Sequence, residues 1–309
     1  MENDDKQQVT RALWAICIFI AINWTVQPLL NHVLAFLVRG LSGLFAAVAG
    51  IAVMLLLSDS SERHSFLGPT KKEHMRILPF LMLVCLACLI EVVGRSVGQG
   101  VTTALYHMTQ AQFQTGIQNV TRGVNNTFFF VFYSLFIAPF LEEAVFRGYL
   151  LHRLEKFGPT VAIFVSALAY VIFHASVVTV TFIFLLSLLL GYISYQYGVR
   201  WAIFFHMVDN AFIPIIASFF PIASVELTEF TIYIVGALIA CLILLMNSGR
   251  IISWFKTHRS KEHSWNMAFV NVPMGILLVA GIVAYALQII WFAERSWEAS
   301  FFCSYKMVI

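Results

Sequence analysis

The sequence predicts an all-α integral membrane protein, a helical bundle of about nine transmembrane helices, with eight as the alternative count. Of its 309 residues, 60% are hydrophobic and only 11% are charged, whereas an ordinary soluble domain carries about 25% charged residues. Apolar runs near the length needed to cross about 30 Å of hydrocarbon recur from Leu13 to Phe292. The alternating pattern of a β-barrel is absent, so the spans are expected to be helices.

Nine apolar segments define the expected spans. The first is too long for the apolar region of a cleavable signal and follows a polar, acidic start, so we expect it to remain as an anchor. The spans lie at 12–37, 41–57, 77–96, 126–146, 159–175, 178–197, 201–219, 229–247 and 268–293.

The cationic residues indicate how the chain is oriented. With nine spans the two termini lie on opposite sides, and 14 of the 19 lysines and arginines fall on the side of the N-terminus. The positive-inside rule therefore predicts a cytoplasmic N-terminus and an external C-terminus in a multi-pass protein of the cell membrane. The main cytoplasmic loops would be 58–76 and 248–266, whose charges suit lipid headgroups; no nucleic-acid partner is expected.

Two adjacent carboxylates stand near the end of the fourth expected span. Glu142 and Glu143 follow a long apolar run, and a carboxylate near the bilayer centre costs about 2.5–3.5 kcal/mol on insertion scales. Glu143 and Arg147 are four residues apart and share one helix face in the favoured order for an ion pair. Glu142 is rotated about 100° away. This spacing predicts that arginine holds one glutamate while the other is free to take a proton from water.

Two further spans bring polar groups to a comparable depth. Tyr170 and His174 are one turn apart in the fifth span, and His206 and Asn210 are one turn apart in the seventh. Each pair alone is equally compatible with structural hydrogen bonding between helices. Three such elements within one third of the chain favour one shared site.

These residues resemble the ordered motifs of the CAAX-protease and bacteriocin-processing (CPBP) family of intramembrane peptidases. The resemblance covers about residues 126–215 and extends to Gly191 and Tyr192 and to the stretch from Gly198 to His206. Tyr170 stands where the family usually has phenylalanine. The motifs are the Glu142–Arg147 run with its flanking proline and glycine, Tyr170 with His174, and His206 with Asn210.

The resemblance implies hydrolysis of a peptide bond in a membrane-associated or lipidated protein or peptide. It implies three domains: N-terminal helices (1–122), a catalytic core of four helices (123–218) and C-terminal helices (219–309). The implied roles are activation of water by Glu142 and His174, oxyanion stabilisation by His206 and Asn210, support of the site by Glu143 and Arg147, and substrate contact by Tyr170.

Three alternatives stay open at this point. In a zinc-dependent version of the same protease, the ligands would be Glu142, His174 and His206. We favour the version without a cofactor because the sequence has no His-Glu-x-x-His helix. From other classes, a proton-coupled transporter or a non-catalytic scaffold or bacteriocin-immunity protein could carry similar groups. Asp209 could tune His206, ligate a metal or face another helix.

Overall fold

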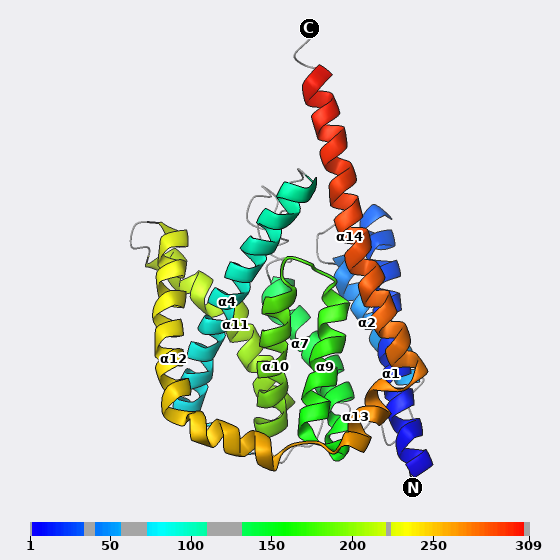
Figure 1. Cartoon of the computed structure of the whole chain (residues 1–309), viewed down its shortest axis with the longest axis vertical. Coiled ribbons are helices and arrows are strands. Elements are labelled where there is room, and N and C mark those ends of the chain that lie inside the picture. The colour runs from blue at the N-terminus through cyan, green and yellow to red at the C-terminus, as the bar shows by residue number, and fades with distance from the viewer. Residues whose placement is uncertain (1, 34–40, 57–72, 110–131, 221–223, 306–309) are drawn as a thin grey trace.

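A computed structural model describes residues 2–33, 41–56, 73–109, 132–220 and 224–305. These ranges are helical apart from short connections and contain no strand, which confirms the all-α class. Figure 1 shows the helices running mostly along one direction, with the chain crossing the bundle repeatedly between the end that holds the N-terminus and the end that holds the C-terminus. We call these ends the N-side and the C-side.

Long outer helices surround a group of shorter ones. Helix α1 packs against α2 and α14, and α4 packs against α12. A short helix, α13, lies on the N-side beside α9 (Figure 1). Their bounds are α1 Glu2–Val33, α2 Leu41–Leu56, α4 Ile77–Thr109, α12 Val225–Thr257, α13 Glu262–Phe269 and α14 Val272–Tyr305.

The shorter central helices begin with an interrupted one, which we call the motif helix. It consists of a π turn at Tyr133–Ile137, α7 at Ala138–Glu143, a second π turn at Ala144–Leu151, and α8 at His152–Leu154. The backbone stays right-handed helical at each junction, so these pieces form one rod. The first π turn ends two residues before Pro139, which has no N–H to donate and therefore cannot continue a regular ladder of backbone hydrogen bonds.

Two glycines set the tight connections between the central helices. Gly158 (φ 119°) precedes α9, Pro159–His174, and Gly198 (φ 99°) separates α10, Val180–Tyr197, from α11, Val199–Phe219. A Cβ on Gly158 would lie 2.1 Å from the Ser260 hydroxyl, so this position requires glycine for both conformation and space. The motif helix and α9 are thereby joined as antiparallel neighbours, as their Gly-Pro junction predicts.

Among the described residues, six helices are long and apolar enough to cross a membrane, and two shorter apolar helices accompany them, which makes the chain a multi-pass membrane protein. The count of nine spans stays a prediction. The six long candidates are Asp4–Leu30, Ile77–Met108, Val180–Tyr197, Val199–Ala217, Val225–Thr257 and Val272–Ile290, and the two shorter helices are Ser42–Leu56 and Pro159–His174.

Several predicted boundaries were wrong. Helix α4 continues 13 residues past the expected end at 96, because Glu91 and Arg95 pair within one turn at 2.5 Å and let the helix continue beyond its most apolar part. The last expected span, 268–293, is divided between α13 and α14. The Asn271 side chain accepts a hydrogen bond from the Met274 amide at 2.9 Å, which starts α14 as a new helix.

Candidate active site

The motif helix directs its two adjacent glutamates to different partners. The Glu142 carboxylate accepts a hydrogen bond from the Tyr170 hydroxyl at 2.7 Å through Oε2. Its Oε1 lies 4.0 Å from Nε2 of His174, and both side chains retain some exposure, 17% for Glu142 and 28% for His174. Glu142 and His174 therefore face each other, and both side chains are partly exposed.

Glu143 lies at the centre of a fully buried ion network. Its Oε1 is 3.1 Å from Nη1 of Arg147 and 3.0 Å from Nδ1 of His206. Arg147 in turn donates through Nη2 to the hydroxyl of Ser187 at 2.6 Å and to the Ser187 carbonyl at 3.2 Å. The Glu143 and Arg147 side chains are both 0% exposed. One carboxylate and one guanidinium thus connect three helices: the motif helix, α10 and α11.

Tyr170 connects this buried network to Glu142. The Arg147 guanidinium lies 4.5 Å from the centre of the Tyr170 ring, in cation–π geometry. The same ring packs edge-on against Phe146 and lies beside His174. With 3% of its surface exposed, Tyr170 is positioned to orient Glu142 rather than to line an open pocket.

The protonation pattern of His174 follows from its neighbours. His174 is the last residue of α9, and its Nδ1 lies 3.1 Å from the backbone carbonyl of Tyr170. A carbonyl oxygen only accepts, so Nδ1 carries the hydrogen, and Nε2 of the neutral ring is an acceptor that faces Glu142. Two acceptors 4.0 Å apart suit a water molecule that donates one hydrogen to each.

The third motif meets the other two from α11. His206 is 4% exposed and its ring centre is 6.4 Å from that of Tyr170. Asn210 donates through Nδ2 to the backbone carbonyl of Ser134 at 3.3 Å, which joins α11 to the beginning of the motif helix. The structure therefore brings all seven predicted site residues to one region, although one donor group of Asn210 is already engaged.

Asp209 faces a different helix. It lines a small cavity with Val84 of α4, Phe205 and Ile213. Asp209 therefore lies beside a neighbouring helix, and its roles in tuning His206 or binding a metal stay predictions.

The zinc alternative would use Glu142, His174 and His206 as ligands. Within the described residues, no group of three or more His, Cys, Asp or Glu side chains could hold a metal ion. His206 turns its Nδ1 to Glu143, and Tyr170 engages Oε2 of Glu142. These contacts use Nδ1 of His206 and Oε2 of Glu142 and leave Nε2 and Oε1 to other partners, so the choice between the zinc-dependent and the cofactor-free version stays a prediction.

Sequence reasoning missed two parts of the site. Ser187 was not singled out, although a hydroxyl in the middle of the apolar α10 is a signal that some polar partner lies opposite it. The contact between Glu143 and His206 was also missed, because residues 63 positions apart on different helices carry no local sign of their pairing.

Comparison with known proteins agrees with the motifs. Residues 124–212 match the family described as "Type II CAAX prenyl endopeptidase Rce1-like". A search of curated proteins found no match. A search of solved structures also found none. The matched segment contains every motif residue that converges at the site, from Glu142 to Asn210, and this part of the chain is therefore similar to the Rce1-like family.

Proposed function

We propose that this chain is an intramembrane endopeptidase that hydrolyses a peptide bond in a membrane-associated protein or peptide. The observation that carries the proposal is the pairing of Glu142 with His174. These two groups can each accept a hydrogen from one water molecule, and they are partly exposed beside an otherwise buried network. A carboxylate and an imidazole at this separation are suited to general-base catalysis.

The reaction needs no nucleophilic side chain. Glu142 removes a proton from the bridging water while the water oxygen bonds to the carbonyl carbon of the substrate, which gives a tetrahedral oxyanion. When this intermediate collapses, the carbon–nitrogen bond breaks and Glu142 returns the proton to the leaving amine. His174 accepts a hydrogen bond from the hydrogen that stays on the water oxygen, and this bond orients the lone pair of that oxygen toward the carbonyl carbon.

His206 and Asn210 are the proposed stabilisers of the oxyanion. The Nδ1 atom of His206 is committed to Glu143, so the ring must donate to the oxyanion from Nε2 and carry both protons when it does so. The buried Glu143 carboxylate favours that doubly protonated ring. Asn210 keeps a second amide hydrogen beyond the one given to Ser134.

Cleavage by the purified protein is expected to stay within about two-fold of its untreated rate in the presence of a strong chelator, because the proposed water is activated by side chains alone. The measurement is the cleavage rate after dialysis against phenanthroline, with and without added zinc. A large loss that zinc restores would instead favour the metal-dependent version with Glu142, His174 and His206 as ligands.

The Tyr170→Phe substitution is expected to lower the cleavage rate only by about ten-fold, since one hydrogen bond to the Glu142 carboxylate is worth roughly 1.5 kcal/mol. The ring that packs against Phe146 and Arg147 is retained. Tyr170→Ala, which also removes the ring, serves as the comparison and should reduce folding stability as well. Equal rates in Tyr170→Phe and the unsubstituted protein would show that the hydroxyl does not help to orient Glu142.

The proposed function is tested by comparing the peptides released in membranes that contain the unsubstituted chain with those that contain Glu142→Gln. Peptides with new termini should appear only with the unsubstituted protein. Identical peptide sets at equal protein levels would contradict the proposal.

A further inference from the structure

Burial changes abruptly along the motif helix at the candidate site. Every residue from Glu143 to Leu151 is buried, whereas Pro139 is the one buried residue between Phe132 and Glu142. The motif helix runs from the C-side to the N-side, so the buried stretch lies on the N-side of Glu142 (Figure 1). Glu142 is therefore the point at which the closed part of the bundle ends.

The same change occurs on the two helices that face it. In α9, Val171 and Ile172 are buried and the residues from Phe173 to Val177 are partly exposed. In α11, Phe205 and His206 are buried and Met207 to Ala211 are partly exposed. Both helices run from the N-side to the C-side, so on all three helices the residues directly past the site on its C-side are partly exposed. On α11 the change is local, because Phe204 is exposed on the N-side of His206 and Ile213 and Ala217 are buried farther along the C-side.

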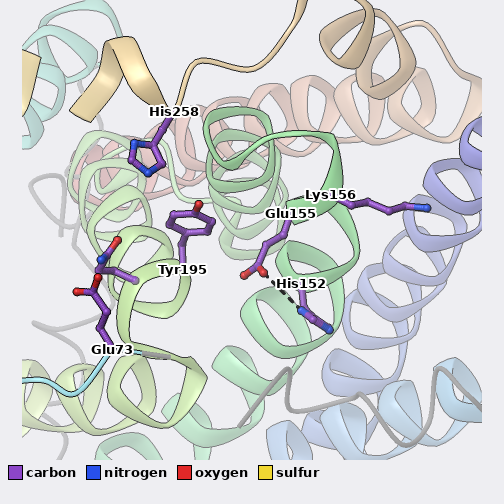
Figure 2. Close-up of a pocket in the computed structure, with 7 residues that line it drawn as sticks. Glu73, His152, Glu155, Lys156, Tyr195 and His258 are labelled. Atoms are coloured by element: carbon purple, nitrogen blue, oxygen red, sulfur yellow. Dashed lines mark ion pairs between the residues drawn. The ribbon is translucent and has the colours of Figure 1, made fainter. Parts of the chain in front are cut away.

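The N-side has a hollow of its own, and it is separate from the site. This open depression has a volume of about 900 Å³. Its lining includes Glu73, Tyr195, His258 and the His152–Glu155 pair, whose atoms are 3.7 Å apart, and Figure 2 shows these side chains. Lys156 also lines the hollow, and its side chain extends toward α1, where the ammonium pairs with Asp5 at 2.8 Å (Figure 2).

Fully buried apolar side chains separate this hollow from the candidate site. In the motif helix, Leu151 and Leu154 lie between Arg147 and the Glu155 of the hollow, and both are 0% exposed. In α10, Leu190 and Ile193 lie between Ser187 and the Tyr195 of the hollow, and both are likewise 0% exposed. Along both helices, apolar side chains without exposed surface thus lie between the N-side hollow and the candidate site.

We propose that the substrate reaches Glu142 and His174 from the C-side, and that the scissile bond lies in the half of the membrane facing away from the cytoplasm. This inference rests on the proposed function. It combines the burial pattern with the cationic N-side, where Arg200, Arg250, Lys256, Arg259 and Lys261 are exposed. The substrate class is then a membrane-anchored or exported peptide cut at its outward part, not a cytoplasmic C-terminal tail.

Single-cysteine variants test the direction of access independently of catalysis. The native cysteines are replaced, and Ser176→Cys, in the connection after His174, is compared with Glu155→Cys in the N-side hollow. A charged, membrane-impermeant methanethiosulfonate is added to right-side-out or inverted membrane vesicles. Ser176→Cys is expected to react at least about ten-fold faster in right-side-out vesicles, and Glu155→Cys in inverted ones. A His174→Cys variant should behave like Ser176→Cys.

The opposite sidedness, or no reaction of Ser176→Cys and His174→Cys from the outward side, would overturn the inference. A second experiment adds a peptide library with a hydrophilic, impermeant tag to the same vesicles. Cleavage is expected only in right-side-out vesicles and not with Glu142→Gln. Outward labelling without any cleavage would count against the proposed function and leave the direction of access standing, whereas cleavage only in inverted vesicles would count against the direction alone.

Discussion

Glu142→Gln is expected to lower the cleavage rate by a factor on the order of 10²–10⁴, the usual contribution of a positioned general base. The amide fills the same space and can still bond with the Tyr170 hydroxyl, which lies 2.7 Å from the carboxylate, but it cannot take a proton from water. The measurement is the rate of peptide release by the purified protein in detergent, at equal protein concentration.

The controls separate lost chemistry from lost structure. Glu142 is partly exposed and outside the buried ion network, so the thermal midpoint of Glu142→Gln should match that of the unsubstituted protein. Glu155→Gln removes a carboxylate with the same side-chain exposure, 17%, from the N-side hollow, and it should cleave normally. A Glu142→Gln protein that cleaves at the full rate would refute the assignment of Glu142 as the base.

The helical class was predictable because long apolar segments are expected to lie in lipid, where the backbone must form its hydrogen bonds within a helix. The ends of helices were less predictable, since they depend on single polar contacts. Asn271 with the following Val-Pro pair does carry a recognisable start signal for α14, and attention to it would have divided the last span correctly. The extension of α4 beyond residue 96 has no comparable sign, because Glu91 and Arg95 resemble any pair of polar residues at the end of a span.

The grouping of the site residues could be predicted because their cost in lipid is high, but their pairing could not. The four-residue spacing predicted the ion pair between Glu143 and Arg147, which are neighbours on one helix. It gave no way to tell that Glu143 also bonds to His206 or that Arg147 bonds to Ser187. Those contacts depend on how three helices are rotated and tilted against one another, and that information is held in the packing of the whole bundle.

Arg147→Met is expected to reduce stability by about 3–5 kcal/mol, the usual result of leaving one partner of a buried ion pair uncompensated. The Glu143 carboxylate would lose its guanidinium partner and keep its contact with His206, and the Ser187 hydroxyl would lose its donor. Methionine preserves most of the side-chain length and packing, so the loss should come from charge. The measurement is the unfolding midpoint in detergent, which should fall well below that of Glu142→Gln.

A second substitution in the same network distinguishes a structural role from a general packing defect. Replacing both partners, as Glu143→Leu with Arg147→Met, removes the unpaired carboxylate and should recover more than about half of the lost stability. The double variant should not cleave the substrate, because His206 no longer has the carboxylate that favours its doubly protonated ring. If the double variant loses as much stability as the two single variants lose together, the charges of the pair do not interact measurably and the side chains contribute only packing volume. Recovery of stability without activity would show that the buried charges serve catalysis more than folding.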